Sequence, residues 1–178
     1  MPQQSTQQLE DMVALTIPAW LPPTGPELLV EPQVVTAYGW TVTWCQGRGG
    51  LVRVVRTGEG LVLTVGDEPH TADRRTRVVL HRDGALTVRA AATPPGLLVS
   101  PASARTIPAV PGIPERAALS PEHRLLVLSA DALDAMPQSL AAVLQELPAQ
   151  VMGAAPADLL SRLFADLPGG SGAVVTRD

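Results

Sequence analysis

The chain has 178 residues, of which 46% are hydrophobic, and its formal net charge is −4. A chain of this length can bury one sizeable core, so we expect a single domain over residues 1–178. The acidic balance, without a basic stripe in the sequence, argues against a nucleic-acid partner and against binding to an anionic membrane surface.

The sequence shows neither the pattern of a signal peptide nor a pair of cysteines. The first twelve residues lack the positive segment and apolar core of a signal peptide, and no apolar run reaches the length of a membrane-spanning helix. Cys45 is the single cysteine, which excludes an internal disulfide and a thiolate zinc cluster. The sequence therefore predicts a cytoplasmic protein with no membrane partner.

Residues 1–33 are predicted to form a leading helix and a proline-rich connector. Ser5 is a suitable N-cap, and apolar residues at helical spacing follow it, which predicts a helix over Ser5–Leu15. Five prolines between Pro18 and Pro32 exclude regular helix. The connector has room for at most a short strand over Glu27–Val30.

Residues 34–136 are predicted to form a β-rich core. Val34–Trp44 is rich in β-branched and aromatic residues, so we expect one strand with a bulge at Gly39, and Trp40 and Trp44 on the same face of it. The next strands are predicted as two hairpins and two single strands: 51–56 with 61–65, 77–81 with 86–90, 94–99, and 124–129. The segment 100–116 contains four prolines and is predicted to be irregular.

Residues 137–178 are predicted to contribute helices and a last strand. Apolar residues recur at helical spacing over 137–147 and 157–167. Gly169, Gly170 and Gly172 end the second helix, and 173–176 can form a strand. Many strands followed by helices indicate an α+β fold with a mainly antiparallel sheet.

Two apolar runs end in an aspartate. The run from Leu61 ends in Gly66-Asp67, and the run from Leu125 ends in Asp131. Two strands that bring carboxylates to one end of a sheet suggest a metal site. Because aspartate is also a preferred turn former, the spacing alone favours both residues as ordinary strand-end turn residues.

The order of these elements resembles the metal-dependent, PPM-type serine/threonine phosphatases, in their SpoIIE-like bacterial branch. The likeness covers almost the whole chain. It is clearest from Asp83 onwards, in the segments 83–99 and 119–135, and the upstream segment 47–68 is also similar. The resemblance implies a two-layer, mainly antiparallel β-sandwich flanked by helices, with αββα layers. The chain leads from Asp73 almost directly into a strand, where the family carries a pair of long helices. We therefore expect that central helix pair to be reduced or missing.

The resemblance also implies which residues would form the family's metal site. In this family, aspartates from four places hold two divalent ions, which activate a water for attack on a phosphoester. Asp67 and Asp131 match two of these places, whereas Leu51 and Gly169-Gly170 stand at the other two.

Few other groups could complete such a site. Glu68 and Asp73 are the candidate helper ligands close to Asp67. His70, His81 and His123 have no recurring metal spacing and are predicted to be surface or packing residues.

The missing carboxylates decide the functional prediction. Two divalent ions about 4 Å apart repel by roughly 16 kcal/mol at an effective dielectric constant of about 20, which four carboxylates can offset and two cannot. We therefore predict a vestigial metal site, no catalytic residue, no cofactor, and a pseudophosphatase that acts by protein–protein interaction in bacterial signalling.

Two alternatives stay open. One is a residual Mn- or Mg-dependent phosphoserine phosphatase that uses Asp67 and Asp131. The other is a structural β-rich module unrelated to phosphatases. If the missing helices leave an apolar face uncovered, that face would be an interface, so we expect a homodimer or a protein partner.

Overall fold

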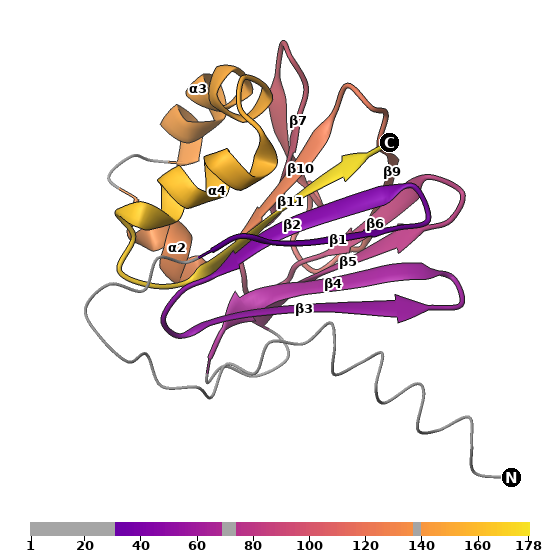
Figure 1. Ribbon diagram of the computed structural model, residues 1–178, viewed down its shortest axis with the longest axis horizontal. Helices are drawn as coiled ribbons and strands as arrows, with labels where there is room; N and C mark the ends of the chain where they lie inside the picture. Colours follow the sequence, from indigo (N-terminus) through magenta and orange to yellow (C-terminus); the bar gives the residue numbers. More distant parts are fainter. Residues whose placement is uncertain (1–30, 69–73, 137–139) are drawn as a thin grey trace, which may run out of the picture.

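The computed structural model describes residues 31–68, 74–136 and 140–178. Within these ranges, eleven strands form two antiparallel sheets, and three helices lie beside one of them (Figure 1). This arrangement confirms the predicted α+β sandwich. The helix predicted over Ser5–Leu15 and the strand predicted over Glu27–Val30 lie outside the described residues.

The first sheet contains six strands in the order β1-β2-β11-β10-β7-β8. Their bounds are β1 (Gln33–Ala37), β2 (Trp40–Gln46), β7 (Gly96–Val99), β8 (Ala104–Ile107), β10 (Arg124–Leu128) and β11 (Ser171–Arg177). The last strand, β11, lies between β2 and β10 and pairs antiparallel with both. The middle of this sheet is therefore formed by a strand from the end of the chain.

The second sheet contains five strands in the order β3-β4-β5-β6-β9, all paired antiparallel. Their bounds are β3 (Gly50–Thr57), β4 (Gly60–Asp67), β5 (Arg75–His81), β6 (Ala85–Arg89) and β9 (Glu115–Ala118). The two predicted hairpins are present as β3–β4 and β5–β6.

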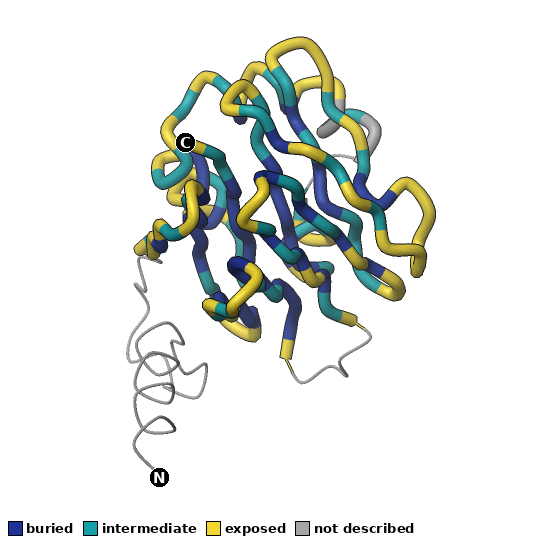
Figure 2. Tube along the Cα trace, turned by 90° about the vertical axis from the view of Figure 1, so that its right-hand side faces the viewer, coloured by how far each residue is buried: buried dark blue, intermediate teal, exposed yellow. Residues whose placement is uncertain are grey.

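The inward faces of the two sheets form the main hydrophobic core. Alternate residues of each strand point inward, and Trp40, Val42 and Trp44 from β2 pack with Val54 and Leu63 from the second sheet. Trp40 and Trp44 are both buried on this side, as their spacing predicted. Figure 2 shows buried residues along the strands and exposed residues mainly at the connecting turns.

The helices α2 (Ala130–Asp134), α3 (Leu140–Met152) and α4 (Pro156–Ala165) form a second core on the outer face of the first sheet (Figure 1). Leu160 and Phe164 of α4 pack there against Cys45 and Val174. Burial raises the pKa of the Cys45 thiol to about 11, so this side chain acts as a packing residue.

The segment Val34–Trp44 forms a hairpin, so the prediction of one continuous strand was wrong. Tyr38 and Gly39 have φ values of 57° and 75°, and strands β1 and β2 pair on either side of them. Positive φ at both central residues is the geometry of a two-residue hairpin turn that fits the strand twist.

Three further elements differ from the predictions. The segment 100–116 contains β8 and the start of β9, each only four residues long, so it is not irregular throughout. Helix α3 continues through Pro148 to Met152 and does not end at Leu147. The short helix α2 was not predicted, although Ser129 caps it with its side chain.

The outer face of the second sheet has no helix on it among the described residues. Residues 68–74 alone connect β4 to β5, and seven residues are too few for a pair of long helices. The shortening predicted from the sequence is therefore present. In the described part of the chain, no helix is long and apolar enough to cross a membrane.

Candidate functional site

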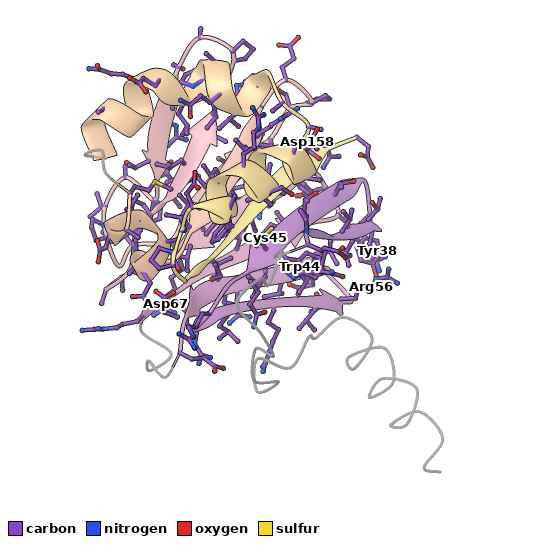
Figure 3. All side chains as sticks on the ribbon, turned by 60° about the vertical axis from the view of Figure 1, so that its left-hand side comes forward. Tyr38, Trp44, Cys45, Arg56, Asp67 and Asp158 are labelled. Atoms are coloured by element: carbon purple, nitrogen blue, oxygen red, sulfur yellow. The ribbon has the colours of Figure 1, made fainter. Side chains whose placement is uncertain are left out.

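Asp67 is the last residue of β4 and lies at one end of the sandwich, opposite the end that carries Tyr38 and Arg56 (Figure 3). Its side chain shares the inward face with Leu61, Leu63 and Val65, because residues two apart in a strand point to the same side. Asp67 is only 2% exposed. A carboxylate this deeply buried needs partners, and its partners indicate its role.

The Asp67 carboxylate binds the start of helix α2. Its Oδ2 accepts a hydrogen bond of 2.9 Å from the backbone amide of Asp131. The hydroxyl of Ser129, the N-cap residue, accepts a second bond from the amide of Ala132 at 3.4 Å. Two of the amides left free at a helix start are thus satisfied by side chains.

The structure therefore brings the two predicted metal ligands together, but the contact joins the side chain of Asp67 to the main chain of Asp131. Asp131 is exposed and lies in the first turn of α2, not in a strand-end turn. Oδ1 of Asp67 is buried and accepts no hydrogen bond from a described residue. The contact shown by the structure is thus helix capping, with one carboxylate oxygen left over.

The other predicted groups contribute little in the described ranges. Glu68 is exposed, and its amide donates a 2.7 Å hydrogen bond to the carbonyl of Gly49. His81 shares a hydrogen bond with Thr87, and His123 shares one with Ser120, which agrees with packing roles. Asp73 and His70 lie outside the described residues.

The position across the hairpin from Asp67 is occupied by Gly50 and not by Leu51. The β3–β4 register pairs Gly50 with Asp67 and Leu51 with Gly66. Leu51 consequently points to the opposite face of the sheet from Asp67. The residue directly opposite Asp67 is thus a glycine, and Leu51, which stands at the family's ligand position by resemblance, carries no carboxylate either.

The Gly169-Gly170 segment, at the fourth family position, is packed against the site by its main chain. The Gly170 amide donates to Arg48 O at 3.0 Å, and its carbonyl accepts from Gly47 N at 2.8 Å. A Cβ built on Gly170 would lie 2.6 Å from Ala132 N and 2.8 Å from Ser129 Oγ. A carboxylate side chain therefore has no room at this position.

Ser171 is a residue of the site that the sequence reasoning missed. Its hydroxyl donates to Gly66 O at 2.7 Å and lies 3.2 Å from Leu51 O, and its amide donates to Ser129 Oγ at 2.9 Å. The residue is completely buried and joins the two sheets at this end. A serine between two glycines, just before an apolar strand, is the signal that could have marked it.

No protein-family model and no curated protein sequence matches the chain. Solved structures do match it. The RsbU and RsbW domains of a Mycobacterium tuberculosis protein superpose with a TM-score of 0.57 at 16% identity. That match covers 83% of this chain and 61% of the other, so this chain spans about three fifths of its length.

Two bacterial phosphatase domains are similar over most of their own length. The SiaA-PP2C domain of Pseudomonas aeruginosa matches with a TM-score of 0.57 at 9% identity, over 79% of this chain and 85% of that one. The phosphatase domain of the Bacillus subtilis cell fate determinant SpoIIE matches with a TM-score of 0.55 at 11% identity, over 80% and 94%. The chain thus has the fold of PPM-type phosphatase domains of the SpoIIE-like kind.

The described residues do not fit the two-metal centre that this fold carries in its catalytic members. They contain no group of three or more His, Cys, Asp or Glu side chains placed to hold one ion. One oxygen of Asp67 is already used by the Asp131 amide. Two divalent ions need more oxygen ligands than one buried and one exposed carboxylate supply, so the donor set of the described residues does not match such a centre.

Proposed function

We propose that this domain is a non-catalytic, PPM-like pseudophosphatase that acts by protein–protein interaction in bacterial signalling, in the cytoplasm. The observation that supports this proposal most strongly is the packing of Gly170. At the position where the family carries an acidic pair, a Cβ on Gly170 would collide with Ala132 and Ser129, so there is no space for a side chain.

The two-sheet sandwich with outer helices argues against the alternative of a β-rich module unrelated to phosphatases. A scaffold that keeps this architecture without its metal ligands retains folded surfaces and loses hydrolysis. Protein binding is the use that such surfaces support.

One observation favours the residual phosphatase as a second candidate. The Oδ1 atom of Asp67 is buried and has no hydrogen-bond partner among the described residues. A buried oxygen of this kind is a suitable ligand for one Mn²⁺ or Mg²⁺. Glu68 follows Asp67 directly in the chain, and Asp131 is brought beside Asp67 by the hydrogen bond from its amide to Oδ2.

Calorimetric titration with Mn²⁺ and hydrolysis of para-nitrophenyl phosphate separate the two candidates. The comparison uses the wild type, Asp67→Asn, and Asp158→Asn as a matched control, because Asp158 is an exposed aspartate on α4 (Figure 3). We expect no binding of two ions and the same background hydrolysis for all three proteins. Binding of two ions, with turnover lost in Asp67→Asn and kept in Asp158→Asn, would overturn the proposal.

A further inference from the structure

The outer face of the second sheet gathers arginines that are scattered in the sequence. The pairing registers align Arg53 of β3, Thr64 of β4, Arg77 of β5 and Arg89 of β6 in one line across four strands. We call Arg53, Arg77 and Arg89 the arginine row. All three are exposed, and none of their side chains forms an ion pair or hydrogen bond with a described residue.

The arginine row has an unfavourable local arrangement. Arg77 and Arg89 are direct cross-strand partners, and like charges in that position destabilise a sheet. Among the described residues of these five strands, no carboxylate faces outward beside Arg77 and Arg89, whereas Asp83 in the β5–β6 turn is paired with Arg116. By strand alternation, the outward-facing residues of β3, β4, β5, β6 and β9 include five arginines and no aspartate or glutamate: Arg53, Arg75, Arg77, Arg89 and Arg116.

This face is also hollowed. The arginine row and Arg75 border a depression of about 470 Å³ whose floor includes Val55 and Val62. These two valines are cross-strand partners, and Val79 continues the line on β5. The face therefore presents a half-buried apolar line beside a line of positive charge, on a chain whose net charge is −4.

We propose that the arginine row and the hollow beside it dock an acidic, extended segment of a protein partner. Guanidinium groups bind carboxylates in planar, two-bond geometry, and the valine line would accept apolar side chains that alternate with the acidic ones. Strands are about 4.8 Å apart, so the row spans about 14 Å, which an extended segment of about five residues covers at about 3.3 Å per residue.

Other occupants fit this face less well. A symmetric dimer through it would bring the same arginines of two copies together with no carboxylate between them. A single-stranded nucleic acid would need large aromatic side chains for base stacking, and the outward-facing residues of these five strands include no Phe, Tyr or Trp. The carboxylates of a protein segment complement both the charge and the apolar line.

This inference rests on the proposed binding function and identifies its surface, but its test is separate. The full chain is titrated against a fluorescein-labelled peptide of about eight residues with alternating glutamate and valine, and against the same peptide with glutamine for glutamate. We expect anisotropy to show binding of the acidic peptide at least about tenfold tighter than of the glutamine peptide, and weaker at high salt.

The substitutions Arg77→Glu and Arg89→Glu should each weaken binding of the acidic peptide by at least about tenfold. Arg56→Glu is the matched control, because Arg56 is an exposed residue of β3 on the opposite face from Arg53 and should bind like the wild type. The Tm of Arg77→Glu should not fall, because the change removes a like-charge contact with Arg89.

Equal binding of the two peptides, or unchanged binding in both row variants, would overturn the docking site. Tighter binding of a single-stranded oligonucleotide than of the acidic peptide would also overturn it, as would a dimer, seen by light scattering, that Arg77→Glu dissociates. These outcomes leave the metal and phosphatase measurements unaffected, so the failure of the surface is distinguishable from the failure of the proposed function.

Discussion

Gly170 has a φ of +90°, and its Cα faces the amide of Ala132 and the hydroxyl of Ser129. Both features restrict the position to glycine, since a side chain would be strained by the backbone and would collide with the start of α2. The residue thereby excludes a carboxylate from the end of the sandwich where Asp67 lies.

Gly170→Ala should therefore destabilise the protein by at least about 2 kcal/mol. Gly58→Ala is the control, because Gly58 has no heavy atom within 4 Å of a built Cβ and no positive φ, and it should change stability by less than about 0.5 kcal/mol. Urea unfolding followed by circular dichroism measures both. Equal stability of Gly170→Ala and the wild type would show that the end of the sandwich has spare room.

At the scale of single residues, the sequence located the two aspartates that meet but not their contact. Asp67 and Asp131 could be singled out because each follows an apolar strand. That Asp67 caps α2, that Gly50 and not Leu51 lies opposite it, and that Ser171 joins the sheets all depend on the register and on packing between distant segments. No local pattern carries this information.

Among the elements, the β5–β6 hairpin has a titratable turn. Asp83 accepts a 3.0 Å hydrogen bond from the Ala85 amide and forms a 2.6 Å ion pair with Arg116. The backbone hydrogen bond, helped by the positive charge of Arg116, holds the pKa of Asp83 below its usual range. The carboxylate form is thus favoured in the folded hairpin.

The stability difference between the wild type and Asp83→Asn should depend on pH. Because the folded pKa is lower than the unfolded one, which is about 3.9, the carboxylate stabilises the fold above that pH and loses this effect as the pH falls through the folded value. We expect the Tm of the wild type to exceed that of the variant at neutral pH, and the difference to shrink in acid. A difference that is constant from neutral pH into this acidic range would contradict the assigned hydrogen bond.

Element prediction succeeded where the local signal was strong. The hairpins β3–β4 and β5–β6 have glycine-containing turns between apolar runs, and α4 has a clear apolar stripe. The β1–β2 turn was missed because tyrosine rarely adopts positive φ, so Tyr38 reads as a strand residue. Strands β8 and β9 are four residues each, and they are recognisable as strands only because they pair with β7 and β6.

For the whole molecule, the proposed loss of the metal centre predicts that divalent ions do not affect stability. An ion present at a hundredfold of its Kd stabilises a fold by about 2.7 kcal/mol, which raises the Tm of a protein of this size by roughly 5–10 °C. We therefore expect the same Tm in Mn²⁺, in Mg²⁺ and in EDTA, measured by calorimetry. A rise of several degrees in Mn²⁺ that Asp67→Asn abolishes would favour the residual enzyme.

The overall architecture was predictable because the order of strands and helices resembles that of a known fold along almost the entire chain. The charge of one face was not. The sequence shows no basic stripe, since Arg53, Arg77 and Arg89 lie 24 and 12 residues apart, and only the antiparallel registers place them in one line. Surface electrostatics of a sheet is a property of the folded molecule.

The central place of β11 has a consequence for biosynthesis. Residues 171–177 are made after all the other strands, yet they separate the β1–β2 pair from the β10-β7-β8 group. Without β11, the β1–β2 pair and the β10-β7-β8 group would be two half-sheets with open edges, which are templates for aggregation. The first sheet is therefore complete only when residues 171–177 have been added, because they follow its other five strands in the sequence.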